Sequence, residues 1–247
     1  MIARDEERML GDCLRSISFA DELLVVVDAA TVDRTREIAR LNGARVEERA
    51  FDNFAGQREA ALRLASGDWV LFVDADERVT PALRAEVLHA VVQPDQRRGF
   101  WIPRENHILG RVVRHAGWYP DYQLRLLERR AAQMDPARVV HEVAVVDGQV
   151  GYLREPLVHF NYATLGDFVL KQERYSALEA ERWLKTYGRP RARALVGQPV
   201  REFWRRYVKL EGYRDGPLGL VLSTLLAYYT ARAIYLARRS SQCSGLT

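Results

Sequence analysis

The sequence predicts an α/β fold, a mainly parallel sheet flanked by helices, followed by a helical C-terminal appendage. Two apolar runs, residues 22–28 (ELLVVVD) and 68–74 (DWVLFVD), have the near-continuous hydrophobicity of central strands buried on both faces. Helical patterns precede, separate and follow these runs, and this alternation is typical of βα units. With 247 residues, 48% of them hydrophobic, the chain can build a sizeable core.

The helices of the first half are predicted from their apolar spacing and their end signals. They cover residues 6–17, 33–41 and 53–65, and a fourth begins at Thr80-Pro81. Asn42-Gly43 is a typical helix stop, as is Ser66-Gly67. Thr80 suits the N-cap position and Pro81 the first helical position, because the proline lacks an N–H that would have no partner there.

The second half predicts shorter strands and then long helices. Residues 110–117 and 122–128 resemble strands on either side of a corner at residues 119–121. Residues 143–146 precede an Asp147-Gly148 turn, which predicts a β-hairpin. Residues 164–187 form a long amphipathic helix pattern, so we place the boundary between a catalytic domain and the C-terminal region after residue 163.

Charge and hydropathy are unevenly distributed over the C-terminal region, residues 164–247. Residues 185–214 contain nine basic residues against two acidic ones. Residues 216–231 carry no charge, but the run is shorter than the ~20 apolar residues of a spanning helix. We therefore expect a helix lying in the membrane interface, or a dimer contact, beside a basic block suited to anionic lipid rather than nucleic acid.

Two cysteines give no sign of a disulfide scaffold or a zinc site. Cys13 and Cys243 lie far apart, and neither has metal-ligand spacing. This usage fits a reducing cytosol.

Acidic side chains stand where the two apolar runs end. Asp28 closes the first run, and Asp74 and Asp76 close the second. In α/β sheets ligands bind outside the carboxyl ends of the strands, although a single acid there is more often a helix N-cap. Asp74 and Asp76 leaving an extended strand can address one ligand from one side. Their hard oxygen atoms suit Mg²⁺ or Mn²⁺ bridging two phosphate oxygens.

The stretch from residue 67 to residue 81, GDWVLFVDADERVTP, closely resembles the family 2 glycosyltransferases, which are inverting enzymes with the GT-A (Rossmann-like) fold. The resemblance is nearest to the branch that adds sugars to the lipopolysaccharide core. It runs nearly end to end, and further matches lie at Arg4-Asp5-Glu6-Glu7, 25–35 (VVVDAATVDRT), Gln57 with Ala60-Ala61-Leu62, 117–126 (GWYPDYQLRL) and 140–142 (VHE).

The resemblance implies specific roles for four acids. Asp28 is expected to bind the nucleotide base or ribose, and Glu6 to lie near the nucleoside. Asp76 would ligate the divalent metal, and Asp74 would face ribose and diphosphate. Residues 1–98 then form the nucleotide-sugar-binding half of a catalytic domain, and residues 99–163 form the acceptor half.

Two departures from the family pattern affect these expectations. Ala29-Ala30-Thr31-Val32 stands where the family usually has Ser-Gly-Ser-Thr, and loss of the glycine restricts a loop that contacts the donor. The chain also opens at Met1-Ile2-Ala3-Arg4, where the family has several more residues of strand. We expect a truncated first strand, with Met1 an internal methionine of it.

The acceptor half offers a catalytic base. Inverting transfer requires a base that deprotonates the acceptor hydroxyl, and a carboxylate is adequate. By resemblance Asp121 is the candidate, beside the aromatic residues Trp118, Tyr119 and Tyr122, which suit stacking on a sugar. The alternative for Asp121 is a turn-capping aspartate after proline.

Other polar residues of the acceptor half are weaker candidates. His141 could complete the metal shell or contact the diphosphate, or else be a buried histidine satisfied by backbone. Arg104 and Glu105 are expected in the acceptor pocket. Arg125 could pair with phosphate, or extend along the sheet with only its head in water.

Together these features predict a metal-dependent transferase, and the resemblance implies that it is inverting, with UDP-glucose as the expected donor. The expected acceptor is a lipopolysaccharide-core or other cell-envelope glycan or glycolipid, met at the cytoplasmic face of the inner membrane. Two alternatives remain open: a catalytically degenerate nucleotide-binding module, and a phosphohydrolase using Asp-x-Asp. The second usually has a hydroxyl residue two positions after the second acid, where this chain has Arg78.

Overall fold

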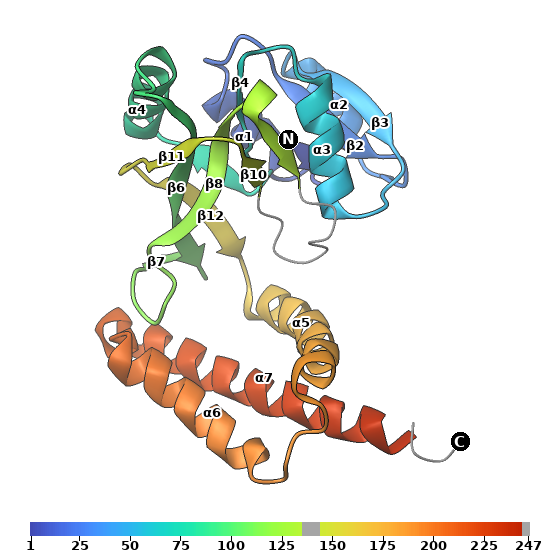
Figure 1. Ribbon diagram of the computed structural model, residues 1–247, viewed down its shortest axis with the longest axis vertical. Coiled ribbons are helices and arrows are strands. Elements are labelled where there is room, and N and C mark those ends of the chain that lie inside the picture. Colours follow the sequence, from blue (N-terminus) through green and yellow to red (C-terminus); the bar gives the residue numbers. More distant parts are fainter. Residues whose placement is uncertain (135–143, 244–247) are drawn as a thin grey trace. The chain divides into compact units, whose positions relative to one another are not determined.

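The computed structural model describes residues 1–134 and 144–243, with side chains described as far as residue 240. Figure 1 shows the elements, which form two compact units. Unit 1 comprises Met1–Glu105 and Asp121–Phe160, and unit 2 comprises Asn106–Pro120 and the chain from Asn161 onward. The predicted boundary after residue 163 thus lies three residues beyond Phe160, and the segment Asn106–Pro120 groups with the C-terminal helices.

Unit 1 opens with three parallel strands in the order β1-β2-β3. Ile2 pairs with Val26 and Leu24 with Arg45, so β2 is the central strand. The elements of this part are β1 (Ile2–Ala3), α1 (Leu10–Ser16), β2 (Leu24–Asp28), α2 (Thr35–Leu41), β3 (Arg45–Arg49) and α3 (Phe54–Leu64). The predicted alternation of strands and helices is confirmed.

Strand β2 is buried on both faces, as its unbroken apolar run predicted. Val25 and Val27 pack in one core with α1, α2 and α4 (Pro81–Val92). Val26, which points to the opposite face, packs in a second core with α3. The two cores hold Asp28 in place at the end of the strand.

A second, seven-stranded sheet completes unit 1 and reaches into unit 2 through β6 and β12. Its path is β4-β8-β6-β12-β5, and both β11 and β7 also pair with β6. The strands are β4 (Trp69–Leu71), β5 (Glu77–Val79), β6 (Arg97–Ile108), β7 (Arg111–Val113), β8 (Asp121–Glu128), β11 (Gln149–Tyr152) and β12 (Leu157–Tyr162). Its β11–β6 pair is parallel, whereas the β4–β8, β8–β6, β12–β5 and β6–β7 pairs are antiparallel. The α/β class is confirmed, with a mixed second sheet.

The predicted hairpin at Asp147-Gly148 is wrong. Strands do flank the turn, but β10 (Ala144–Val146) pairs with β9 (Ala132–Met134), which follows the 3₁₀ turn η1 (Arg129–Ala131). On the other side, β11 pairs in parallel with β6. A turn-forming dipeptide fixes only the local reversal, and here each flanking strand finds a different partner.

Two helices begin with a threonine cap, of which the cap at Thr80 was predicted. Thr80 Oγ1 accepts a hydrogen bond from the backbone N–H of Leu83 at 3.1 Å, with Pro81 at the first helical position of α4. Thr164 Oγ1 caps α5 (Leu165–Tyr187) by accepting from the backbone N–H of Asp167, and the Asp167 carboxylate accepts from the backbone N–H of Thr164, which completes a capping box.

Unit 2 is helical, with β7 and the ends of β6 and β12 joined to it. Its further helices are α6 (Ala194–Trp204), the π-helical turn η2 (Arg205–Lys209), the 3₁₀ turn η3 (Gly212–Asp215) and α7 (Gly216–Cys243). Helix α7 packs against both α5 and α6. The core of the unit gathers side chains from strands and helices: Ile108, Val113, Tyr162, Phe168, Leu222 and Tyr229.

One helical stretch of the described chain, Gly212–Ser240, is long and apolar enough to cross a bilayer by length and composition alone. Within unit 2, however, Leu222, Ile234 and Ala237 of this stretch are fully buried. Burial of this kind is expected of the central helix of a packed bundle. The interface helix or dimer contact expected at residues 216–231 stays a prediction.

Candidate active site

Asp28 ends β2 with its carboxylate almost fully buried, at 4% exposure. Oδ1 accepts a hydrogen bond from the backbone N–H of Ala30 at 3.0 Å. Oδ2 lies 3.2 Å from Nη1 of Arg4 but accepts no hydrogen bond within the described residues. A buried carboxylate oxygen with unused acceptor capacity is well suited to a hydroxyl or N–H of a ligand.

Arg36 makes several side-chain contacts with the Ala29-Ala30 loop that follows Asp28. Arg36 donates to the carbonyl oxygens of Thr31 at 2.6 Å and of Ala29 at 3.1 Å, and it is ion-paired with Glu48 at 3.1 Å. These contacts fix the backbone of a loop that lacks the family's glycine. The expected weakening of donor contacts there stays a prediction.

Asp74 and Asp76 face different protein partners. Strand β4 ends at Leu71, so both acids lie in the loop before β5, and the alternation expected of an extended strand does not apply. Asp74 accepts hydrogen bonds from Arg58 Nη2 at 2.9 and 3.1 Å and from Arg125 Nη2 at 2.5 Å. Asp76 Oδ2 lies 3.3 Å from Nε2 of His159 on β12.

Glu77, directly after the two acids, is the buried centre of an ion network. It is 0% exposed, and its Oε2 accepts a hydrogen bond from the backbone N–H of Asp74 at 2.9 Å. Its Oε1 lies 3.0 Å from Arg125 Nη2 and 3.5 Å from Arg104 Nη1. The Glu77 carboxylate therefore ties the acidic loop to two arginines of the second sheet.

Asp121, the candidate base, lies at the other end of this network. Arg104 Nε and Nη2 both donate to Asp121 Oδ2, at 2.9 and 2.5 Å, and Gln123 Nε2 donates to Oδ1 at 2.9 Å. Strand pairing explains the contact, because Arg104 of β6 is directly opposite Asp121 of β8. Two neighbours thus fix the orientation of this carboxylate.

Burial and ion pairing oppose each other in the network. Burial alone would raise the pKa of Asp74, but the guanidinium groups of Arg125 and Arg58 outweigh it and hold that pKa well below its usual range. Burial raises the pKa of Glu77, with Arg125 opposing the change and Asp74 adding to it. Ion pairs with Asp74 and Glu77 in turn raise the pKa of Arg125 above its ordinary value, despite burial. Asp74 is therefore held ionised.

Glu6 lies close to the acidic loop from the N-terminal side. Its backbone N–H donates to Thr35 Oγ1 at 2.7 Å, which fixes the turn before α1. Burial raises the pKa of Glu6 to about 7, and the negative charges of Asp76 and Asp74 contribute to the increase. Glu6 therefore lies where the negative charges of neighbouring acids disfavour its ionised form.

The raised pKa predicts that replacing Glu6 with glutamine stabilises the protein at neutral and alkaline pH. A carboxyl whose folded-state pKa is raised destabilises the fold progressively as pH rises from about 4.5 to about 7. Glu6→Gln should therefore raise the free energy of unfolding by ~1 kcal/mol above pH 7, after allowance for solvent screening of a partly exposed group. Below pH 4.5 the gain should vanish.

Denaturant titration of wild type, Glu6→Gln and the exposed-site control Asp68→Asn at both ends of this pH range measures the difference. If Glu6→Gln raised the free energy of unfolding equally at both pH values, the proposed repulsion between Glu6 and the neighbouring acids would be contradicted.

The predicted acceptor aromatics are divided between the two units. Tyr122 belongs to unit 1, where its ring makes an edge contact with Tyr152 at 5.0 Å, and Trp101 stacks on Tyr152 at 6.3 Å. Trp118 and Tyr119 belong to unit 2, and Trp118 packs edge-on against Tyr162. The roles of all three predicted aromatics stay predictions.

The remaining predicted residues are Arg104, Glu105 and His141. Arg104 and Glu105 are neighbours on β6, so their side chains point to opposite faces of the sheet, and Arg104 takes the face of Asp121 and Glu77. His141, the tentative metal ligand, lies outside the described residues.

Asp76 and His159 are the side chains of the described chain best placed to hold a divalent cation. No cluster of three or more histidine, cysteine or acidic side chains with metal-binding geometry occurs among residues 1–134 and 144–240. One carboxylate oxygen and one imidazole nitrogen fit Mn²⁺ or Mg²⁺, provided that a ligand such as a diphosphate supplies further oxygens. The donor set therefore fits a metal that is shared with a substrate.

Sequence reasoning missed Glu77, Arg58, Gln123 and His159. Along β8 a signal existed, since Asp121, Gln123 and Arg125 recur every second residue and so line one face of the strand. No comparable signal marks His159, which is an isolated histidine in an otherwise mainly apolar strand.

Comparison with known proteins identifies the family. A sequence model of glycosyl transferase family 2 matches residues 1–148, more than half of the chain. The chain belongs to glycosyl transferase family 2. This family 2 glycosyltransferase is 29% identical to the lipopolysaccharide core biosynthesis glycosyltransferase LpsC of Rhizobium meliloti (strain 1021), over 95% of its own length and 90% of that protein.

More distant relatives agree with this assignment. An uncharacterized glycosyltransferase of Rickettsia bellii (strain RML369-C) is 23% identical to the family 2 enzyme described here, with 100% of this chain and 88% of that protein covered. Among solved structures, the mannosyltransferase PcManGT from Pyrobaculum calidifontis, in complex with GDP-Man and Mn²⁺, is similar with a TM-score of 0.54. It shares 13% identity over 96% of this chain and 85% of that chain, which shows the fold alone. The predicted GT-A fold is confirmed.

Proposed function

We propose that this family 2 glycosyltransferase moves a hexose from a nucleotide-sugar donor to a cell-envelope glycan, with inversion at the anomeric carbon. The observation that carries the proposal is the Asp76–His159 pair, in which the negative charge of Asp76 also acts on Glu6. Arg4, two residues before Glu6 in the sequence, contacts Asp28. Similarity to LpsC supports a lipopolysaccharide-core acceptor, and UDP-glucose is the most specific form of the donor proposal. PcManGT, with GDP-Man and Mn²⁺, is a precedent for a nucleotide-sugar and a metal on this fold.

Four acids would divide the work of binding the donor. Asp28 would accept hydrogen bonds from the base or ribose through its free acceptor capacity, and Glu6 would lie near the nucleoside. Asp76 and His159 would hold Mg²⁺ or Mn²⁺. Asp74 would face ribose and diphosphate, kept ionised by Arg58 and Arg125. A bound divalent ion supplies positive charge that stabilises a leaving nucleoside diphosphate.

Asp121 would act as the base in acceptor activation. In an inverting transfer the acceptor oxygen attacks the face of the sugar opposite the leaving group, and a carboxylate removes its proton. Arg104 and Gln123 each hold one oxygen of Asp121, so the carboxylate is oriented before the acceptor arrives. Tyr122 and Glu105 would contact the acceptor, and Trp118 and Tyr119 are proposed for stacking on its sugar rings.

A location at the cytoplasmic face of the inner membrane would bring the enzyme to a lipid-linked acceptor. The C-terminal basic block and the apolar helix α7 support this placement. The exposed face of α7 carries Val221, Tyr228 and Tyr235, spaced seven residues apart, which also suits a homodimer contact.

Donor binding and hydrolysis test the proposed chemistry directly. Wild type, Asp76→Asn and His159→Gln are each titrated with UDP, GDP, ADP and dTDP sugars, with Mn²⁺ and with chelator. We expect one preferred donor, and Mn²⁺-dependent hydrolysis that falls at least about 10²-fold in both variants, because each removes a ligand of the metal.

The matched control is Asp68→Asn, the same chemical change at an exposed position of unit 1, and it should retain wild-type hydrolysis. A folded wild-type protein that binds no donor would overturn the proposal in favour of a degenerate nucleotide-binding module. Binding without metal dependence would remove the role given to Asp76 and His159.

A further inference from the structure

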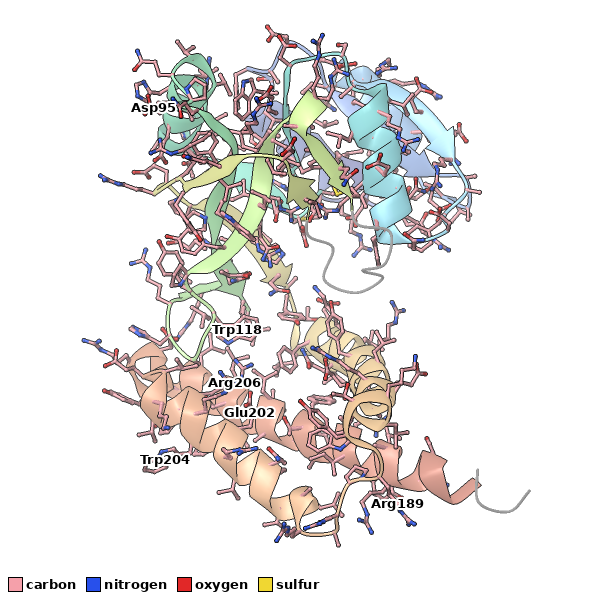
Figure 2. All side chains as sticks on the ribbon, in the orientation of Figure 1. Asp95, Trp118, Arg189, Glu202, Trp204 and Arg206 are labelled. Atoms are coloured by element: carbon pink, nitrogen blue, oxygen red, sulfur yellow. The ribbon has the colours of Figure 1, made fainter. Side chains whose placement is uncertain are left out.

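Helix α6 and the turn η2 that continues it present an exposed row of apolar side chains. Val196, Val200, Trp204 and Val208 recur every fourth residue and are 69%, 63%, 55% and 36% exposed. Residues four apart lie almost above one another on a helix, so these side chains form one stripe. Figure 2 shows Trp204 on the side of α6 that faces away from α7. A large exposed aromatic in such a row calls for a partner.

A row of basic residues runs beside this apolar stripe. Arg201, Arg205 and Lys209 are exposed, lie four residues apart and each directly follow an apolar residue of the stripe, and the exposed Arg193 lies at the N-terminal end of α6. The one acid in this stretch, Glu202, lies on another side of the helix and is paired with Arg205 and Arg206. The exposed face therefore combines apolar contact area with net positive charge.

A basic cavity of about 570 Å³ lies at the start of α6. Its lining includes four arginines, Arg189, Arg191, Arg193 and Arg201, together with the aromatic pair Trp183 and Tyr187. No carboxylate lines it, and among the described residues none of these four guanidinium groups forms an ion pair with an acid. Four uncompensated guanidinium groups around one cavity point to phosphate as the ligand.

We propose that the α6 face, defined by the apolar stripe Val196, Val200, Trp204 and Val208 and the basic row beside it, docks on an anionic phospholipid bilayer. The stripe enters the boundary between headgroups and acyl chains, with Trp204 at the level typical of interfacial tryptophan. The basic row and the arginine cavity bind lipid phosphates. The inference rests on the proposed membrane location and assigns it to α6, because the α6 face combines an exposed apolar stripe with several exposed basic residues.

Charge also argues against a second copy of the chain as the occupant. A two-fold contact through this face would bring the same patch together from both subunits. The basic rows would then oppose each other, and like charges face to face in an interface cost several kcal/mol. A bilayer with anionic lipids instead supplies complementary charge and hydrocarbon together.

Vesicle flotation tests this assignment with the full chain. Wild type should bind phosphatidylcholine vesicles that contain phosphatidylglycerol, and bind pure phosphatidylcholine far more weakly. Trp204→Ser should lower the partition coefficient about tenfold through lost apolar contact. Arg201→Gln combined with Lys209→Gln should lower it about 25-fold, since each removed charge is worth roughly fivefold near an anionic surface.

Matched changes on the exposed side of α5 serve as controls, because Leu170 is 66% exposed and Arg174 is exposed. Leu170→Ser and Arg174→Gln should leave vesicle binding within about twofold of wild type. Metal-dependent donor hydrolysis in solution should be unchanged in all these variants, so failure of docking and failure of the proposed chemistry can be told apart.

Three outcomes would overturn the assignment. One is equal binding of wild type and the α6 variants to anionic vesicles. Another is no preference for phosphatidylglycerol. The third is a dimer of wild type in sedimentation that dissociates in Trp204→Ser, which would make the face a contact between copies.

Discussion

Replacing Asp121 with asparagine is expected to lower kcat by about 10²–10⁴-fold, the range that a positioned general base contributes. The change removes a proton acceptor but keeps an oxygen for Arg104 and an amide that can pair with the reoriented side chain of Gln123. Donor binding, measured by titration with nucleotide-sugar and Mn²⁺, should stay within about threefold of wild type. The thermal midpoint should also change little, because the strand pairing of β6 and β8 is untouched.

Asp95→Asn supplies the matched control for this prediction. Asp95 lies in the turn before β6, far along the strand from Arg104, and is labelled in Figure 2. Its φ of 47° is one that asparagine adopts readily, so the substitution should be silent in both stability and activity. A kcat for Asp121→Asn within about tenfold of wild type would reduce Asp121 to the turn-capping aspartate of the alternative interpretation.

Replacing Arg125 with methionine should lower the free energy of unfolding by about 3–5 kcal/mol at neutral pH. The arginine is 3% exposed and is the shared partner of Asp74 and Glu77, so its loss leaves buried carboxylates uncompensated. Burial already raises the pKa of Glu77 in the wild-type protein, and loss of Arg125 removes the guanidinium that most strongly opposes the increase, leaving Arg104 and the backbone N–H of Asp74.

The deficit should depend on pH with a definite sign. A buried acid with a raised folded-state pKa costs nothing when it is protonated in both states, and its cost grows as pH rises above the ordinary value of 4.5. The deficit of Arg125→Met should therefore shrink as pH falls toward 4.5, and adding Glu77→Gln should recover part of it at neutral pH. Urea titrations across this range give both quantities.

Arg63→Met is the corresponding control, because Arg63 is 77% exposed and its ion pair within the described part of the chain is with Glu59 on the surface of α3. Its effect should be under ~1 kcal/mol. A deficit in Arg125→Met that is no larger than this, or that does not vary with pH, would show that the network does not hold the loop.

Local pattern was sufficient for the strands and caps that flank the donor site. The apolar run of residues 24–28 is buried on both faces as expected, and Asp28 stands at its carboxyl end because the strand is short and central. Thr80 caps α4 because its side chain reaches a backbone N–H three residues ahead. Such features depend on residues that are close together in the sequence, so the sequence alone is enough to predict them.

The ion network was not predictable, since its partners come from distant segments of the chain. Asp74, Arg104, Asp121 and Arg125 meet because β8 lies between β4 and β6, and Arg58 reaches Asp74 from α3. Strand order and helix packing are both long-range properties. The failed hairpin at Asp147-Gly148 has the same origin. Likewise, His159 approaches Asp76 through the pairing of β12 with β5, in which His159 is opposite Glu77.

The path of the chain through the two units limits how this enzyme can be divided or recombined. Residues Ile108, Val113 and Tyr162 belong to the core that Phe168 and Leu222 complete, so a polypeptide that stopped at residue 163 would expose a broad apolar surface and tend to aggregate. Exchange of the C-terminal helices between relatives as a cassette would fail for the same reason. Chimeras should tolerate the exchange only when residues 106–120 travel with the helices, because the two segments belong to one compact unit.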